Sequence, residues 1–221
     1  MFQVLRFKFQ EKGITIIEIV VASFIIALFS AIIITNFPKI LKQSALSRVS
    51  YKLAQDFRKT QDLGLSGIKI LDASSNPILA SGYGIYLNRT SSTKQYIIYA
   101  DVKPNSTTPG DSKYNDAGSH NCVAYGVSQP YNCCDQDTSP TTDCVVEIID
   151  ISKENPDLYI KAISNIIGPT TSINFSPPGP TTKIDRIISI QNPIGITLGI
   201  TSDTSATRTI QVNTSGLINV Q

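Results

Sequence analysis

The sequence ITIIEIVVASFIIALFSAIIITNF, from Ile14 to Phe37, decides the architecture of the N-terminal part of the chain. It holds 24 residues and one charged side chain, Glu18. At a rise of about 1.5 Å per residue, such a helix is about 36 Å long, enough to cross a hydrocarbon core of about 30 Å. We therefore predict a transmembrane helix over residues 14–37.

A short basic leader, residues 1–13 (MFQVLRFKFQEKG), precedes this apolar run with three basic side chains and one acidic one. Positive charge in front of an apolar helix keeps that end in the cytoplasm, which puts the rest of the chain outside. A secretory signal peptide has an apolar region of only about 7–15 residues and ends in a small-residue cleavage site. This run is longer and has no such site, so an uncleaved membrane anchor is the simpler alternative.

The junction Lys12-Gly13-Ile14-Thr15-Ile16-Ile17-Glu18 resembles the processing site of type IV pilins and type II secretion pseudopilins. The resemblance implies that a prepilin peptidase on the cytoplasmic face cuts after Gly13 and N-methylates Ile14. Ile14 is a mild departure, because Phe is the usual first residue in that family. Glu18 would then be the fifth residue of the mature chain.

Glu18 is the candidate assembly residue. Cleavage after Gly13 would expose an α-ammonium group on Ile14, and Glu18 of a neighbouring parallel helix could pair with it. Ionisable groups within a membrane segment are costly unless they are paired, which makes a functional role their default interpretation. A tolerated polar residue in a simple anchor is the alternative.

Residues 38–66 change from uniformly apolar to amphipathic. Apolar residues recur there mainly at a spacing of four, which predicts that the helix continues and buries one stripe on a folded domain; they are Leu41, Ala45, Leu46, Val49, Leu53 and Phe57. We predict a kink or local loosening at Pro38, which cannot donate a helical hydrogen bond. Gly64 and Gly67 are predicted to stop the helix.

Residues 67–221 are predicted to form an extracytoplasmic β-rich domain. Short β-branched and aromatic runs are the signal; they cover 68–71, 84–87, 95–100, 145–149, 173–175, 184–190, 194–200, 208–212 and 217–220. Polar turns at 88–93 and 213–216 predict hairpins. Strands joined in this way favour an antiparallel sheet and an α+β fold, whereas a parallel doubly wound fold needs strands alternating with helices.

Three further segments, 53–67, 82–86 and 209–216, resemble the H-type minor pseudopilins and the related minor pilins, the GspH/FimT family. The resemblance implies a pilin-like fold, in which one long N-terminal helix packs on an antiparallel β-sheet domain. It does not extend to residues 101–144.

Residues 101–144 form a polar insert that contains all four cysteines, Cys122, Cys133, Cys134 and Cys144. Four cysteines allow three pairings. Adjacent cysteines rarely bond to each other because their geometry is poor, so we expect Cys133 and Cys134 each to pair with Cys122 or Cys144. Disulfides persist outside the cytoplasm, and they would order this insert.

Other chemistry in the insert has weaker support. Zinc ligands usually include cysteine pairs separated by two to four residues, which are absent. The carboxylates Asp135, Asp137 and Asp143 lack the spacing of a standard calcium loop. His120 lies beside Cys122 but is more typical of a surface residue than of a catalytic base. Asn88 and Asn105 begin glycosylation sequons, a short pattern that recurs by chance. We expect no catalytic residue, no resident metal and no cofactor.

The charge balance argues against a basic nucleic-acid surface. The formal net charge is +2, and removal of the leader would lower it to zero, which gives no strong signal for nucleic acid. We predict a minor pilin or pseudopilin, held in the cytoplasmic membrane before it enters a pilus or pseudopilus. Its partners would be the prepilin peptidase, other pilin subunits, the inner-membrane assembly platform and membrane lipid. A membrane-anchored extracellular binding module and a DNA-uptake pseudopilin are the alternatives.

Overall fold

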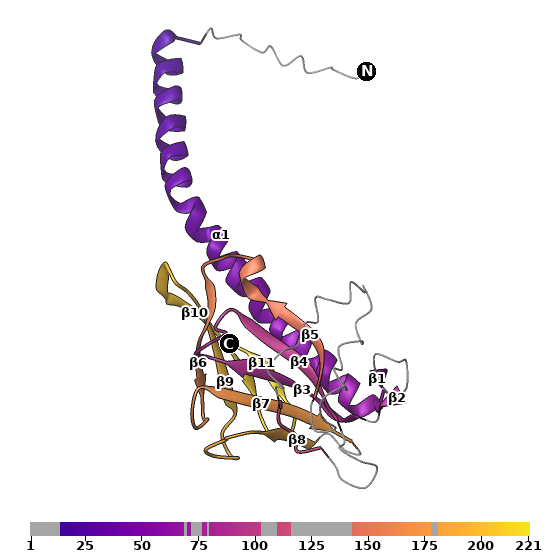
Figure 1. Ribbon diagram of the computed structural model, residues 1–221. Helices are drawn as coiled ribbons and strands as arrows, with labels where there is room; N and C mark the ends of the chain where they lie inside the picture. Colours follow the sequence, from indigo (N-terminus) through magenta and orange to yellow (C-terminus); the bar gives the residue numbers. More distant parts are fainter. Residues whose placement is uncertain are drawn as a thin grey trace, which may run out of the picture. The chain divides into compact units, whose positions relative to one another are not determined.

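A computed structural model describes residues 14–68, 70–71, 77–78, 80–102, 110–115, 143–177 and 181–221. The chain divides into two compact units, Met1–Leu41 and Lys42–Gln221. One helix, α1 (Ile16–Ser66), begins in the first unit and ends in the second. Figure 1 shows this helix and the strands of the second unit.

In the first unit, the described residues are the start of α1 and the two residues in front of it. Thr15 caps the helix: its carbonyl oxygen accepts hydrogen bonds from the backbone N–H groups of Glu18 (3.1 Å) and Ile19 (3.3 Å). The polar side chains of Ser30, Thr35 and Asn36 donate to the carbonyl oxygen four residues earlier. These bonds satisfy the polar side chains within the helix itself. Pro38 lies inside α1, and the kink there stays a prediction.

In the second unit, α1 buries the predicted stripe from Ala45 to Phe57, whereas Leu41 is exposed. The helix ends after Ser66, and Gly67 has the positive φ of +60° that is common just beyond a helix C-terminus. Gly64 does not stop the helix, contrary to the prediction. It is a buried helical residue at which a Cβ atom would overlap the backbone carbonyl of Phe175, so it allows the helix to approach β7 closely.

The strands form two antiparallel sheets and one small ribbon. The five-stranded sheet has the order β5-β4-β3-β7-β8 and comprises β3 (Ala80–Asn88), β4 (Gln95–Val102), β5 (Cys144–Asp150), β7 (Thr170–Ser176) and β8 (Thr181–Ile184). The four-stranded sheet has the order β11-β10-β9-β6 and comprises β6 (Leu158–Ser164), β9 (Ile194–Ile200), β10 (Asp203–Val212) and β11 (Ile218–Val220). The ribbon pairs β1 (Ile70–Leu71) with β2 (Pro77–Ile78), and the short 3-10 helix η1 (Ile151–Lys153) follows β5.

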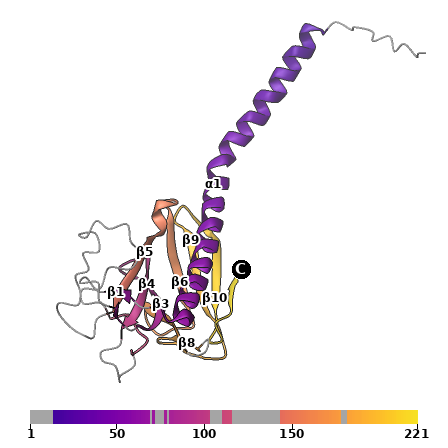
Figure 2. The ribbon, with the colours of Figure 1, turned by 90° about the vertical axis from the view of Figure 1, so that its right-hand side faces the viewer.

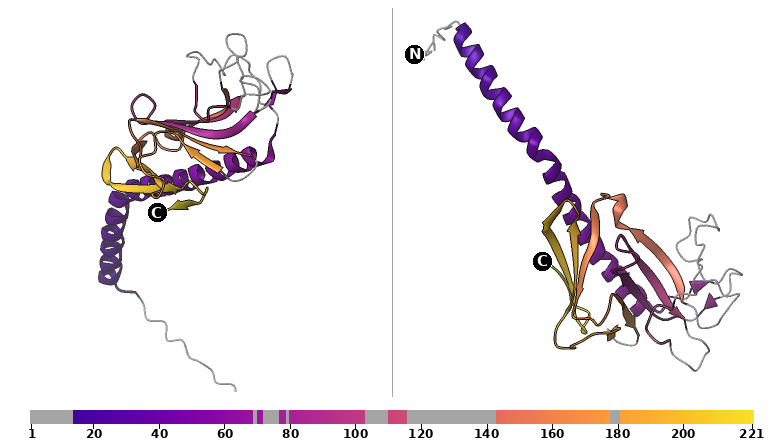
Figure 3. Two further views of the ribbon diagram at one scale, coloured as in Figure 1. Left: turned by 90° about the horizontal axis from the view of Figure 1, so that it is seen from below. Right: turned by 60° about the vertical axis from the view of Figure 1, so that its left-hand side comes forward.

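One hydrophobic core joins the second half of α1 to both sheets. In Figure 3 (right), the yellow strands of one sheet and the magenta and orange strands of the other lie side by side, with α1 behind them. Alternate residues of β3, Tyr83, Ile85 and Leu87, enter the core. Tyr96 of β4 also donates a short hydrogen bond from its hydroxyl to the carboxylate of Asp56 on α1. The prediction of an α+β fold with antiparallel sheets is confirmed.

Both predicted hairpins are present. β3 pairs with β4 across the turn at 88–93, and β10 pairs with β11 across 213–216. In the second turn, Gly216 has a φ of +81°, which a glycine adopts without strain.

One strand prediction fails, and one strand of the core was missed. The strand predicted at 184–190 ends at Ile184, because the chain turns at Asp185 and Arg186, and Arg186 has a φ of +60°. β6 was not predicted from the sequence. Its pairing with β9 shifts register between Ile160 and Ala162, so both Ile160 and Ile163 enter the core and the strict alternation is lost.

Candidate functional site

The first candidate site is the N-terminal half of α1. All described residues from Ile14 to Leu41 are exposed. The helix is long and apolar enough to cross a membrane, and its most apolar window has no buried residue. Nothing else in the chain covers this surface, among the residues that the structure describes. Its large side chains, including Phe24 and Phe29, therefore need an apolar environment that the chain does not supply.

Glu18 lies in the first turn of this surface. Its backbone N–H lies 3.4 Å from the Thr15 hydroxyl, and the pattern Thr15-Ile16-Ile17-Glu18 has the spacing of a capping box. An acidic side chain in the first turn is also favoured by the helix dipole. Glu18 thus has a local role in starting the helix. In the described part of the chain, no hydrogen bond or ion pair occupies its carboxylate, which leaves it open to a partner.

Of the two residues at the predicted processing site, the structure describes one. Ile14 is exposed at the start of the described chain, whereas Gly13 lies outside the described residues. The cleavage and methylation therefore stay predictions.

Of the four cysteines predicted to form disulfides, one lies among the described residues. Cys144 is buried at the first position of β5, opposite Ala100 of β4. Cys122, Cys133 and Cys134 lie outside the described residues, as do His120, Asn105, Asp135 and Asp137. The pairing of the cysteines stays a prediction.

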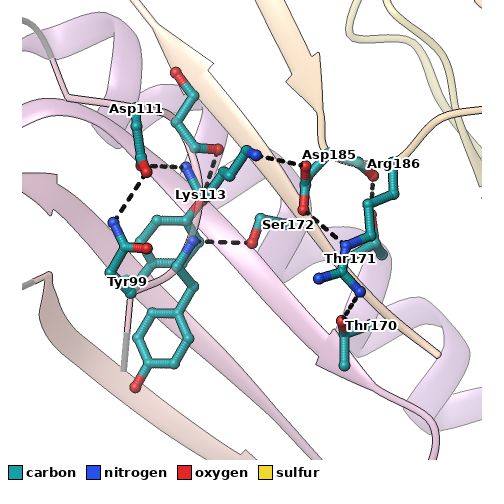
Figure 4. Close-up of polar contacts among 11 residues, drawn as sticks. Tyr99, Asp111, Lys113, Thr170, Thr171, Ser172, Asp185 and Arg186 are labelled. Carbon is teal, nitrogen blue, oxygen red and sulfur yellow. Dashed lines mark hydrogen bonds and ion pairs between the residues drawn. The ribbon is translucent and has the colours of Figure 1, made fainter. Parts of the chain in front are cut away.

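The second candidate site is a polar platform on the five-stranded sheet, formed where residues 110–115 cross one of its faces. The ring of Tyr114 lies against those of Tyr86 (4.8 Å between centroids) and Tyr99 (5.3 Å). The Tyr99 hydroxyl donates to the carbonyl oxygen of Ser112, and the backbone N–H of Tyr114 donates to Ser172 Oγ. Tyr99 comes from β4 and Ser172 from β7, two strands with β3 between them, and both residues are labelled in Figure 4. These contacts fix the segment on the sheet.

Two buried carboxylates hold the ends of the platform. Asp143 accepts hydrogen bonds from the backbone N–H groups of Val102 (3.1 Å) and Asn115 (2.8 Å), while Asp101 accepts from Ser112 N–H (2.9 Å). Burial raises the pKa of Asp143 to about 7, an effect that the two N–H donors oppose and the nearby charges of Asp101 and Asp111 reinforce. Asp143, considered above as a calcium ligand, is thus occupied by backbone donors. No cluster of potential ligands for a metal ion occurs among the described residues.

An ion-pair cluster borders the platform. Lys113 Nζ lies 3.3 Å and Arg186 Nε 3.5 Å from the two carboxylate oxygens of Asp185, and Arg186 also donates to Thr170 Oγ1 (2.8 Å). These contacts are drawn as dashed lines in Figure 4. A pocket of about 250 Å³ lies among Asp111, Lys113 and Arg186. Its charges largely neutralise one another, so the arrangement resembles a fixed surface network more than a binding site.

This platform was not predicted from the sequence. Only Asp143 was singled out, and for a different role. Local sequence carries no signal for the platform, because the contacting residues come from β3, β4, residues 110–115, Asp143, β7 and the turn after β8. The sequon residue Asn88, by contrast, has a structural role: its Oδ1 accepts from the N–H groups of Thr90 and Ser91, and its Nδ2 donates to Ser91 Oγ.

No family model, curated protein or solved structure matches this chain.

Proposed function

We propose that this chain is a minor pilin or pseudopilin, a structural subunit of a type IV pilus or a type II secretion-like filament. One observation carries the proposal. A single helix has an exposed apolar half with one acidic residue near its start, and a second half that packs on a β-rich domain. In this proposal, the apolar half resides in the membrane and later in the filament interior, while the β-domain is displayed outside the cytoplasm.

The proposal assigns separate roles to the residues at the start of the helix. Prepilin peptidase cuts after Gly13, which removes the basic leader and creates an α-ammonium group on Ile14. Glu18 of a neighbouring subunit pairs with this charge. Leaving one partner of such a pair unpaired in an apolar surrounding costs about 3–5 kcal/mol. This energy supports alignment of adjacent subunits, and it requires other pilin subunits and the inner-membrane assembly platform as partners.

The capping geometry at Thr15 favours a second candidate, a membrane-anchored extracellular binding module. If Glu18 serves only to start the helix, its carboxylate has no assembly role, and the chain needs no processing at Gly13. The two candidates therefore differ in what Thr15 and Glu18 do.

The test combines N-terminal sequencing with two variants of the full-length chain, expressed with its own peptidase. The proposal expects a mature chain that begins at Ile14, with or without one added methyl group. Glu18→Ala should still be cleaved but be lost from filaments, whereas Thr15→Val, which removes only the capping hydroxyl, should still assemble. A chain that keeps Met1, or normal incorporation of Glu18→Ala, contradicts the filament role and favours the anchored module.

A further inference from the structure

A groove lies in the second unit between α1 and the last strand of the four-stranded sheet. It holds about 220 Å³. Four helix residues at the spacing of one helical face form one wall, and the three residues of β11 form the other; they are Tyr51, Ala54, Gln55 and Arg58 from α1, and Ile218, Asn219 and Val220 from β11. Figure 2 shows the C-terminal end of the chain beside α1.

The strand that borders this groove has a free edge. β11 is the outermost strand of its sheet and pairs only with β10. Thr209 and Gln221 exchange both backbone hydrogen bonds, at 3.1 and 2.8 Å. In an antiparallel ladder, residues whose backbone groups bond to the partner strand alternate with residues whose backbone groups point away from it. The backbone N–H and C=O groups of Asn219 therefore also point toward β10, whereas those of Ile218 and Val220 point away from it. In the described part of the chain, no backbone group pairs with this outer edge.

The helix wall supplies the groups that would select a ligand. Tyr51 is 61% exposed, although aromatic side chains of this size are usually kept for cores and interfaces. Arg58 is exposed, and among the described residues no carboxylate lies within ion-pair distance of it. The residues that line the groove include no acidic side chain. Among its lining residues, the groove therefore has one charged group, the guanidinium of Arg58, and one aromatic side chain, that of Tyr51.

We propose that this groove binds an extended peptide segment of a partner protein, which adds a strand to the edge of β11 and places a carboxylate on Arg58. Strand addition takes its affinity from main-chain hydrogen bonds and its specificity from pockets for alternate side chains. The two outward-facing residues, Ile218 and Val220, supply the main-chain groups. The groove is smaller than the 300–1,000 Å³ that is usual for small-molecule sites, and it suits one side chain of such a strand. This inference is independent of the filament role.

The test uses the isotopically labelled full-length chain in detergent micelles. The probe is the peptide acetyl-Thr-Val-Glu-Val-Thr-amide, and the same peptide with Lys in place of Glu is its control. Titration with the acidic probe should shift the backbone amide NMR signals of Ile218 and Val220, and the Lys peptide should bind at least about tenfold more weakly, because it loses a charge-assisted hydrogen bond.

Two variants separate the main-chain and charge contributions. Val220→Pro removes an outward-pointing N–H but no ladder bond, which an edge strand tolerates, and it should weaken binding of the acidic probe about tenfold. Arg58→Glu should weaken it by a similar factor and reverse the preference between the peptides. Arg208→Glu makes the same charge change on an exposed residue of β10 that does not line the groove, and it should have no effect. Near-UV circular dichroism of the tyrosines verifies that each variant is folded.

Three outcomes overturn the proposal. The first is the absence of any shift at Ile218 and Val220 with either peptide. The second is equal binding of the two peptides to the unchanged protein. The third is protection of these two amides without peptide that rises with protein concentration, together with loss of the Ile218 protection in Val220→Pro, which would assign the groove to a second copy of this chain.

Discussion

The two halves of α1 belong to one helix but differ in the burial of their apolar side chains. From Ile16 to Leu41 every side chain is exposed, although most are apolar, whereas from Ala45 to Phe57 one apolar stripe is completely enclosed. The second half is also attached to the β-domain by polar contacts, such as the ion pair between Lys59 and Glu147 (2.9 Å). Apolar content therefore does not indicate where a helix is buried. The spacing of the apolar residues does.

Leucines on the two halves provide the largest contrast. Leu53 is fully buried, and Leu28 is 49% exposed. Leu53→Ala should lower the free energy of unfolding of the β-domain by about 2–5 kcal/mol, because it leaves a cavity in the core. Leu28→Ala should change it by less than about 0.5 kcal/mol. Urea unfolding followed by near-UV circular dichroism of the tyrosines measures both, and equal effects would refute the division of the helix.

Two glycines sharpen the comparison within the second half. A Cβ atom at Gly64 would overlap the backbone of Phe175, whereas at Gly67 it would meet no atom but would be strained by the positive φ. Gly64→Ala should therefore cost about 2–3 kcal/mol through displacement of the helix from β7. Gly67→Ala should cost only about 1 kcal/mol. The same unfolding assay applies, and the reverse order would mean that Gly64 only ends the helix, as the sequence suggested.

The buried carboxylates of the second unit predict a smaller, pH-dependent effect. The pKa of Asp143 is raised to about 7 when folded, from an ordinary value of 3.8, so the folded protein binds a proton that the unfolded chain has released. Its contribution to stability is complete below pH 3.8 and is lost as the pH rises through 7. The domain should lose about 1.4 kcal/mol between pH 6 and pH 8 from this group.

Asp143→Asn is the control for this pH effect. The variant removes the titration but also one of the two acceptors for the N–H groups of Val102 and Asn115, so the pH slope is compared and not the absolute stability. Asp56 remains in the variant, and burial raises its pKa as well. A slope unchanged by Asp143→Asn would show that Asp143 is not the titrating group.

Local patterns predicted most of the elements correctly. The long helix, the hairpin at 88–93 and the hairpin at 213–216 each depend on residues close in sequence, and all three are present. The strand β6 was missed because its bulge interrupts alternation, and the strand at 184–190 was wrong because Arg186 adopts a left-handed backbone. Neither the bulge nor the left-handed backbone can be recognised from the types of the residues involved.

The candidate sites were likewise predictable only where their residues lie close together in the sequence. Glu18 stands out in the sequence because a charge interrupts an apolar run. Arg58 and Val220 are 162 positions apart, and only the packing of β11 beside α1 brings them to one groove. The roles of Gly13, Ile14 and Glu18 in assembly depend on molecules other than this chain, which no fold of a single subunit can provide.

The attachment of Asp143 to Val102 has a consequence for how this domain can vary. The hydrogen bond joins the two ends of the segment between β4 and β5, and the flanking residues Ala100 and Cys144 are already paired in the sheet. The cost of closing a loop grows only logarithmically with its length, by about 0.6 kcal/mol for each doubling. Within this connection, residues 116–142, which come after the platform segment 110–115 in the sequence, can therefore be lengthened, shortened or replaced by a foreign sequence at little cost to the sheet. It is the natural place to graft an epitope or reporter tag.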